Sequence, residues 1–435
     1  MATQFSVSDD IQWKSRFFTI WGGQALSLLG SQLVSFAIIW YLTVESGSAT
    51  VLAIASLVAL LPQVIIGPLV GPLIDRWNRR RIMVIADSII AAATLLLAYM
   101  FAIGQVEIWQ IYVLMFVRSI AGGFHGPAMT ASTSLMVPVE HLTRIQGLNQ
   151  MLNGGLNIVS APLGALLLEA LPLQGILGID VVSALFAIVP LFFLDVPQPD
   201  RSKSTSLTGE EASFWGDFKA GFKYMISWKG LLIVGIMASL INFLLTPAFS
   251  LLPLLVNGYF GKDAIAFGSM EALFGIGVIA GSLLLGVWGG FKRRIITAMI
   301  GLGGIGIGTL VLGVLPPSGF TWAVVALTFL GVVQPITNGS LLGLVQAIVA
   351  PDMQGRVFTL TSSISGAMSP IGLAIAGPIS DTLGKQTWFI VGGVTCILMA
   401  AVSMMVPAVM NIEDEGRAIN EKGMDESVSE MLARE

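Results

Sequence analysis

The chain has 435 residues, of which 55% are hydrophobic and 11% are charged, and its formal net charge is −4. Soluble domains contain roughly 25% charged residues, so this composition excludes a soluble globular protein and predicts a polytopic membrane protein. The single cysteine, Cys396, excludes a disulfide framework and a cysteine-based zinc site. The two histidines are too few for most histidine metal sites. No metal and no cofactor is expected.

The apolar stretches predict about twelve membrane-spanning helices, because one span needs roughly 20 apolar residues. Residues 1–16 are polar and lack a cleavable signal pattern, so we expect them to precede the first span. Six spans are expected in residues 17–196 and six in residues 230–410. The predicted spans are 17–43, 50–74, 82–103, 108–136, 144–170, 175–195, 230–257, 265–289, 294–315, 320–349, 357–383 and 387–410.

A polar segment, residues 197–229, separates the two sets of spans. Within it Phe214, Phe218, Phe222 and Met225 recur at helical spacing, which predicts an amphipathic helix. Two alternatives stay open for that helix: it lies in the membrane interface, or it packs on neighbouring protein. Residues 411–435 are acidic and polar and are expected to form a solvated tail.

The basic residues fix the predicted orientation of the chain in the cell membrane. Of the 22 lysines and arginines, all but Arg118, Lys262 and Lys385 fall in segments on the side of the two termini. Loops rich in lysine and arginine face the cytoplasm. We therefore expect both termini and the central segment to be cytoplasmic.

The two halves of the chain resemble each other. Residues 79–82 (Arg-Arg-Arg-Ile) are echoed by residues 292–295 (Lys-Arg-Arg-Ile), and 160–165 by 368–373. Two parallel repeats predict an all-α protein of two six-helix bundles with a cavity between them, opened alternately by rocking. The proline–glycine pairs of the second echo are hinge candidates in the fifth and eleventh spans: Pro162, Gly164, Pro370 and Gly372.

Residues 71–81 place one carboxylate and four arginines between two apolar spans, so they must form a tight loop at a membrane face. The loop resembles the motif G-x-L-x-D-R-x-x-R-[RK] that the major facilitator superfamily carries between its second and third helices. The matching residues are Gly71, Leu73, Asp75, Arg76, Arg79 and Arg80, and Asn78 stands where that family often has glycine.

Further stretches are similar to the macrolide efflux branch of the drug:proton antiporters. They are residues 17–27, 118–120, 124–128, 315–320 and 355–358. Residues 118–122 resemble the superfamily's helix-four motif, and residues 157–164 resemble its helix-five antiporter motif with Ala161 in place of glycine. The resemblance covers nearly the whole chain. It implies proton-driven export of macrolides or similar lipophilic compounds, with siderophore exporters as near relatives.

The loop of residues 71–81 is the candidate conformational switch. Asp75 can accept hydrogen bonds from a neighbouring helix N-terminus and pair with Arg79, whereas a simple topology anchor needs only the positive charges. Charged groups inside the spans are candidates for proton coupling: Asp87, Arg118, Asp180 and Glu271. Arg118 is expected to face the cavity or a carboxylate. The alternative for each acid is a structural hydrogen bond. His125, seven residues after Arg118 on the same helix face, is either a packing residue or a proton relay.

The amide side chains inside the spans have two possible roles. Asn149, Asn153 and Asn157 fall four residues apart and predict one polar helix face. Together with Gln24, Gln32 and Asn242 they either line a substrate cavity or hold helices together.

The sequence also limits the classes of function that the protein can have. The chain has no G-x-x-x-x-G-K-[ST] loop, so it is not predicted to be a primary ATP pump. The leading hypothesis is a secondary exporter of lipophilic drugs; the rivals are an exporter of siderophores, lipids or metabolites and, more remotely, an intramembrane enzyme. Dispersed acids argue against the enzyme. The expected partners are the bilayer and a small lipophilic substrate, without nucleic acid, and a monomer is expected.

Overall fold

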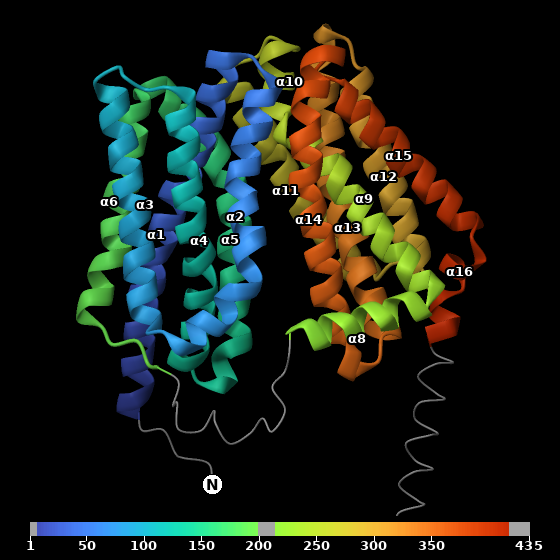
Figure 1. Ribbon diagram of the computed structural model, residues 1–435, viewed down its shortest axis with the longest axis horizontal. Coiled ribbons are helices and arrows are strands. Elements are labelled where there is room, and N and C mark those ends of the chain that lie inside the picture. Colours follow the sequence, from blue (N-terminus) through green and yellow to red (C-terminus); the bar gives the residue numbers. More distant parts are fainter. Residues whose placement is uncertain (1–6, 199–213, 417–435) are drawn as a thin grey trace, which may run out of the picture. The chain divides into compact units, whose positions relative to one another are not determined.

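The computed structural model describes residues 7–198 and 214–416, and within these ranges the chain is helical without any strand. Twelve helices have between 19 and 40 residues. In the first half they are α1 (Val7–Ser46), α2 (Ala49–Arg76), α3 (Arg79–Ala102), α4 (Ile108–Met136), α5 (Val139–Ala170) and α6 (Leu173–Phe193). In the second half they are α9 (Lys229–Ser250), α11 (Ala264–Trp288), α12 (Arg294–Val314), α13 (Phe320–Ile348), α14 (Pro351–Leu383) and α15 (Thr387–Met405) (Figure 1).

Eleven helices among the described residues are long and apolar enough to cross a membrane. The twelfth long helix, α4, falls short in hydropathy because Arg118, His125 and a run of small hydroxyl residues dilute its apolar side chains. It nevertheless packs between α2 and α3 over its length. The predicted all-α membrane fold is therefore confirmed.

The chain divides into two compact units. The first comprises Met1–Leu207 and Val256–Ala272, and the second comprises Thr208–Leu255 and Leu273–Glu435. Helix α11 thus contributes its first part to the first unit: Phe267 stacks on Phe36 and Trp40 of α1, with ring centroids 5.5 Å and 5.8 Å away.

Prolines explain where the helix boundaries differ from the predicted spans. Helices α5 and α14 begin at Val139 and Pro351, several residues earlier than predicted, so the segments expected to lead into the fifth and eleventh spans are helical. A proline fits the start of a helix because its missing N–H would be unpaired there anyway. The predicted span 230–257 is two helices, α9 and α10 (Leu252–Gly258), because Pro253 cannot donate to the preceding turn.

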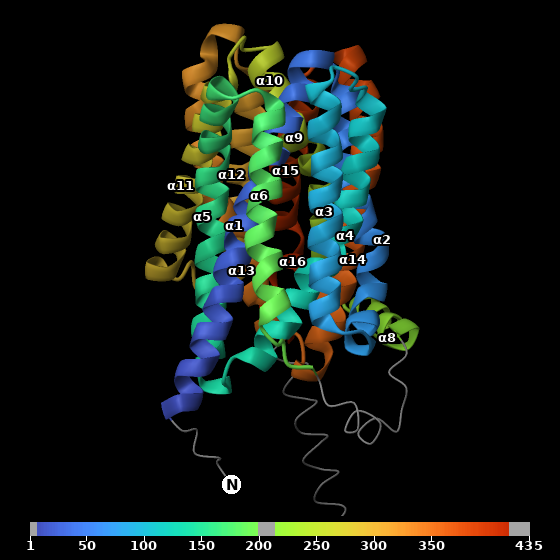
Figure 2. The same ribbon diagram turned by 90° about the vertical axis from the view of Figure 1, so that its left-hand side faces the viewer.

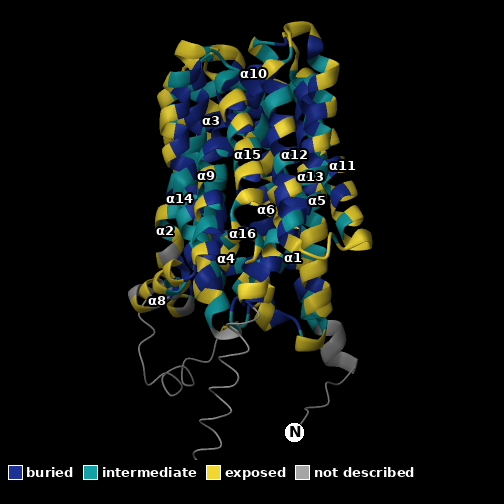
Figure 3. Ribbon diagram, turned by 90° about the vertical axis from the view of Figure 1, so that its right-hand side faces the viewer, coloured by how far each residue is buried: buried dark blue, intermediate teal, exposed yellow. Residues whose placement is uncertain are grey.

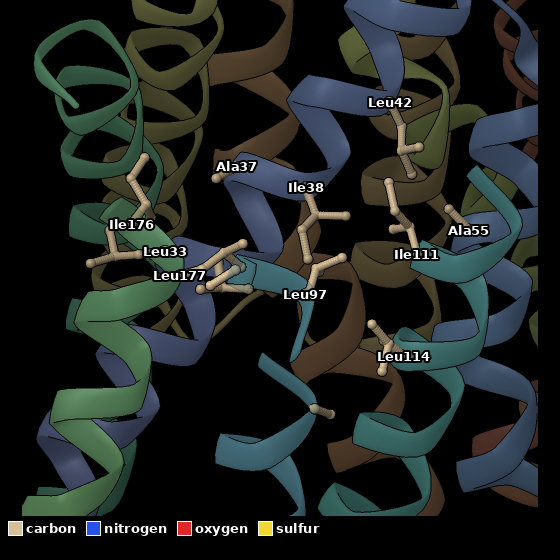
Figure 4. Close-up of a cluster of buried hydrophobic side chains, with 13 residues drawn as sticks. Leu33, Ala37, Ile38, Leu42, Ala55, Leu97, Ile111, Leu114, Ile176 and Leu177 are labelled. Atoms are coloured by element: carbon tan, nitrogen blue, oxygen red, sulfur yellow. The ribbon is translucent and has the colours of Figure 1, made fainter. Parts of the chain in front are cut away.

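The core of the first unit is apolar and draws on helices far apart in the chain. Leu33 and Ile38 of α1 meet Leu97 of α3, Ile111 of α4 and Leu177 of α6 in one buried cluster (Figure 4). These contacts bring α1, α3, α4 and α6 side by side (Figure 2). The helices that carry the intramembrane charges are thereby held against one another.

The second unit is packed through glycines and hydroxyl pairs. Helix α12 approaches α15 closely, because a Cβ on Gly306 would lie 2.7 Å from the backbone nitrogen of Ile397. Between α9 and α14, Thr246 and Ser369 hydroxyls lie 2.9 Å apart. Small residues of this kind let membrane helices approach without a hydrophobic driving force.

The amphipathic helix predicted in the central segment is α8 (Phe214–Ser227), which runs across the ends of α9 and α14 (Figure 1). Met225 is buried and packs on Gly235 of α9, while Phe222 and Lys223 are exposed, as is much of the helix (Figure 3). The side chains of Phe214 and Phe218 lie outside the described residues. The helix packs on protein at Met225 and leaves Phe222 facing outward.

Candidate functional site

The loop between α2 and α3 is organised by its polar side chains. Asn78 caps α3, since its side chain accepts a hydrogen bond of 3.1 Å from the backbone N–H of Arg81. Arg79 is buried and its Nη1 atom donates to the carbonyl of Ala131, near the end of α4, over 2.7 Å. This loop therefore begins a helix and ties that helix to α4.

Arg80 ties the same loop to the end of α6. Its guanidinium donates to the carbonyls of Leu191 and Phe192, the latter at 2.6 Å, and lies 3.2 Å from the carboxylate of Asp195. Cations at a helix C-terminus are favourable because the last carbonyls are unpaired and carry partial negative charge. Of the other motif residues, Gly71 and Arg76 are exposed at the end of α2. The side chain of Asp75 lies outside the described residues.

The second unit repeats this arrangement. The Nη1 atom of Arg294, at the start of α12, donates to the carbonyl of Gly343, near the end of α13, over 3.0 Å. The backbone N–H of Arg294 donates to the carboxylate of Glu413 at 3.1 Å, as that of Arg79 donates to the Gln198 amide oxygen at 3.0 Å. Arg79 and Arg294 are thus equivalent in structure, two residues out of register with the echo seen in the sequence.

A buried ion pair joins α4 to α6 inside the first unit. The Nη1 atom of Arg118 lies 2.7 Å from Oδ2 of Asp180, whose side chain is 1% exposed. The same carboxylate accepts hydrogen bonds of 3.0 Å from the hydroxyls of Thr94 on α3 and Ser31 on α1. Of the two surroundings expected for Arg118, the structure shows the carboxylate.

A second polar group joins α1, α3 and α4. Nε2 of His125 lies 3.2 Å from Oδ1 of Asp87, an ion-pair distance without hydrogen-bond geometry. The amide nitrogen of Gln24 donates to Oδ2 of Asp87 over 3.0 Å. All three residues are buried. Asp87 thus holds a titratable partner, whereas Asp180 holds an arginine, which stays charged at any physiological pH.

These two groups form parallel layers across the helices. Gln24 and Ser31 on α1, Asp87 and Thr94 on α3, and His125 and Arg118 on α4 are each seven residues apart. Seven residues are about two helical turns, or roughly 10 Å along the axis. Because α4 runs antiparallel to α3, its two residues meet those of α3 in reverse order. The three seven-residue spacings are visible in the sequence, but they did not lead to a prediction of which residues pair with which.

Glu271 stands apart from both layers. It lies on the part of α11 that belongs to the first unit, one turn beyond Phe267 and Gly268. Gly268 packs closely on α5, since a Cβ there would lie 2.8 Å from the carbonyl of Ala161. Glu271 is half-buried, and its carboxylate has no hydrogen bond or ion pair with any residue that the structure describes.

A polar cavity of about 350 Å³ adjoins the Asp87 layer. Gln24 and His125 of that layer form part of its wall, Trp21 closes one side, and its lining comes from α1, α4 and α5. The indole N–H of Trp21 donates to the side-chain oxygen of Asn149 over 2.8 Å. Five of its fourteen lining residues are carboxamides, namely Gln24, Gln146, Asn149, Gln150 and Asn153.

The cavity gathers some of the predicted amides and leaves others out. Gln32 and Asn157 do not line it, because a side chain eight residues further along a helix is rotated by about 80°. Asn242, in the second unit, donates to the carbonyl of Ala238 in its own helix at 2.9 Å. Gln146 and Gln150 also line the cavity, although they were not among the candidates named from the sequence.

The hinge candidates differ in how tightly they are packed. A Cβ on Gly372 of α14 would collide with the backbone carbonyl of Phe243 on α9, whereas one on Gly164 of α5 would meet the ring of Phe36 at 2.8 Å. Pro162 and Pro370 lie inside α5 and α14, respectively. Gly372 therefore marks a close helix crossing in addition to neighbouring a proline.

The chain has clear relatives among known proteins. A family model described as the Major Facilitator Superfamily matches residues 20–373. Macrolide efflux protein A of Streptococcus pyogenes is 36% identical over 402 residues, covering 92% of this chain and 98% of that protein. A protein of the same name from Enterococcus faecalis is 35% identical over 328 residues, covering 75% of this chain and all of that protein.

More distant proteins share the fold. The multidrug efflux pump Tap of Mycobacterium tuberculosis is 24% identical over 398 residues, covering 88% of this chain and 91% of that protein. Among solved structures, a D-xylose–proton symporter superposes with a TM-score of 0.66 at 15% identity, covering 88% of this chain and 96% of that one. The nucleoside transporter NupG gives a TM-score of 0.62 at 14% identity, covering 88% and 98%.

Proposed function

The chain belongs to the Major Facilitator Superfamily, and from this premise we propose that it is a proton-coupled antiporter that exports macrolides or other lipophilic drugs by alternating access. It is a multi-pass membrane protein whose relatives are efflux transporters. The proposal extends this to a monomer in the cell membrane with both termini in the cytoplasm, driven by the proton gradient without a bound cofactor.

The observation that carries the proposal is the contact of the buried Asp87–His125 pair with a polar cavity. Histidine and carboxylate side chains are the groups that most often carry protons in proteins, and here Nε2 of His125 and Oδ1 of Asp87 lie 3.2 Å apart. Because His125 and Gln24 also line the cavity, a proton taken up by this group alters the wall that a substrate would touch. Antiport requires that proton binding and substrate binding affect each other, and a shared wall provides a way for them to do so.

Glu271 is the second proposed proton carrier. A carboxylate that has no partner among the described residues is costly inside a membrane when it is charged. Binding a proton removes that cost, so the group is suited to gain and lose one during transport. The Arg118–Asp180 pair is assigned a supporting role, because arginine keeps its charge.

The α2–α3 loop is the proposed switch. Arg79 binds the end of α4 and Arg80 binds the end of α6. A movement of α2 relative to α3 would therefore be transmitted to α4 and α6. Asp75 is the residue in the motif that topology does not require. We expect Asp75→Asn to abolish transport while leaving the amount of protein in the membrane unchanged, and full transport by that variant would remove the switch from the proposal.

Transport in inside-out vesicles under an imposed pH gradient tests the function directly, after a susceptibility panel in a host without its own pumps has chosen the compound. We expect gradient-driven uptake that is lost in Asp87→Asn and Glu271→Gln and kept in Arg293→Gln, which changes an exposed charge. Uptake driven by a sodium gradient alone would contradict proton coupling. Uptake only of siderophores or lipids would contradict the drug assignment.

A further inference from the structure

The polar cavity beside Asp87 contains a buried acceptor that the protein itself does not satisfy. Gln24 is 3% exposed, and its amide nitrogen is used by Asp87. Its Oε1 atom is buried and has no hydrogen-bond partner within the described structure, while Gln24 as a residue lines the cavity. A buried carbonyl oxygen without a partner is unfavourable, so the Gln24 amide would gain a hydrogen bond by turning toward a donor bound in the cavity.

The remaining lining offers both halves of a hydrogen-bonding surface. The hydroxyls of Thr130 and Thr133 donate to carbonyls of their own helix, which leaves their oxygens as acceptors. Asn149 uses its oxygen for Trp21 and keeps its amide N–H groups as donors. Gln150 and Asn153 are exposed at the cavity and have no partner in the described residues.

The charges around the cavity argue against an ionic ligand. No lysine, arginine or carboxylate belongs to its described lining, so the cavity offers an anion no permanent counter-ion, and His125 is already held by Asp87. Asp87 lies behind Gln24 and His125, which occupy both of its oxygens, so a cation would not reach it. Hydroxyl groups, which donate and accept, match this lining best.

The size of the cavity limits what it can hold. A volume of about 350 Å³ lies at the lower end of the range of roughly 300–1,000 Å³ for ligand pockets. One sugar ring with its hydroxyls fits within it. A whole macrolide is several times larger, so the rest of such a molecule would have to remain outside this cavity.

We propose that this cavity, formed by α1, α4 and α5, binds a hydroxylated ring of monosaccharide size carried on a larger lipophilic compound. The proposal rests on the export function proposed above and adds which part of the cargo is recognised. Gln24 accepts a hydroxyl of the ring, the amides of Asn149, Gln150 and Asn153 bind its other hydroxyls, and Trp21 provides an apolar wall.

Binding to the purified full-length chain tests the recognition without requiring transport. The probes are a macrolide glycoside and the same macrolactone without its sugars, titrated by calorimetry in detergent. We expect the glycoside to bind at least tenfold more tightly. Gln150→Leu and Asn153→Leu should each weaken the glycoside about tenfold, which is the usual value of one hydrogen bond of 1.4 kcal/mol, and leave the sugar-free compound unchanged.

The matched control is Gln63→Leu, which removes an exposed amide from α2 that does not line the cavity. It should bind both probes as the unmodified chain does. Equal binding of the two probes, or an equal loss for both in the cavity variants, would overturn the sugar site. Vesicle uptake separates the two proposals: sugar-dependent binding without gradient-driven uptake refutes the exporter alone, whereas gradient-driven uptake that ignores the sugar refutes this site alone.

Discussion

The ion pair between Arg118 and Asp180 makes the sharpest prediction about stability. Asp180→Asn keeps the shape of the side chain but removes its charge. The guanidinium of Arg118, whose side chain is 12% exposed, would then lie among apolar helices without a counter-charge. The hydrogen bonds of Thr94 and Ser31 to the same side chain would also have to rearrange, because an amide offers one acceptor oxygen in place of two.

The magnitude follows from what each change leaves behind. Removing one partner of a buried ion pair costs about 3–5 kcal/mol, because the other charge stays buried and uncompensated, whereas replacing both is often nearly neutral. Asp180→Asn and Arg118→Gln should therefore each lower the free energy of unfolding by about this amount. The double variant should lose no more than either single variant, which corresponds to a coupling energy of at least about 3 kcal/mol.

The measurement is a double-mutant cycle on the full-length protein in mixed micelles, with unfolding followed as the denaturing detergent fraction rises. Arg293 and Asp414 supply the matched control, because their atoms lie 3.2 Å apart but their side chains are 47% and 56% exposed. An exposed pair of this kind contributes about 0–1 kcal/mol. If the Arg118 and Asp180 effects add to within about 0.5 kcal/mol, the buried pair does not act as a unit and the reasoning fails.

Three further outcomes are expected from thermal unfolding of purified variants. Asn78→Ala should cost about 1 kcal/mol through the lost helix cap, and replacement by glycine only a few tenths; equal losses would contradict the cap. Arg80→Gln should destabilise the protein clearly, since it removes a bridge to the end of α6, whereas Arg81→Gln, at an exposed side chain, should stay within about 0.5 kcal/mol; the reverse order would refute the bridge. Gly372→Ala should lower the melting temperature more than Gly164→Ala, because a backbone carbonyl cannot move as a phenylalanine ring can; similar losses would show that the helix crossing is soft.

The fold could be predicted well because membrane spans and their orientation follow from the hydropathy and charge of consecutive residues. Each long helix overlaps a predicted span, including α4, which the loops on both sides delimit even though its own hydropathy is low. The early start of α5 at Val139 was missed, since a polar helical turn and a loop have similar composition. The break between α9 and α10 was missed because apolar sequence runs through it.

The site was predicted residue by residue but not as an arrangement. Asp87, Arg118 and Asp180 stood out because charges are rare in spans, yet nothing in a single sequence says that a residue on α4 meets one on α6, 62 positions away. Pairing depends on which helices are neighbours and on their rotation. Rotation also explains why Asn153 lines the cavity while Asn157, on the same predicted face, does not.

The two units share an architecture but not their chemistry. Both tie the start of their third helix to the fourth and to the segment after the sixth, through Arg79 in one and Arg294 in the other. The buried interior polar groups of the second unit's described spans are serines and threonines, which carry no charge; one of them, Ser369, bonds across helices to Thr246.

The acidic and basic groups deep in the described spans all belong to the first unit, namely Asp87, Arg118, His125, Asp180 and Glu271. Because a charge inside the membrane is costly, the presence of all five in one unit favours a role for that unit that the other does not share. The shared loop geometry then fits a common mechanical role, and the layers on α1, α3 and α4 fit the proton-coupling step that we propose. Moving that step to the second unit would need a carboxylate there, so vesicle transport that survives neutralisation of Asp87 and Glu271 together would remove the asymmetry as an explanation.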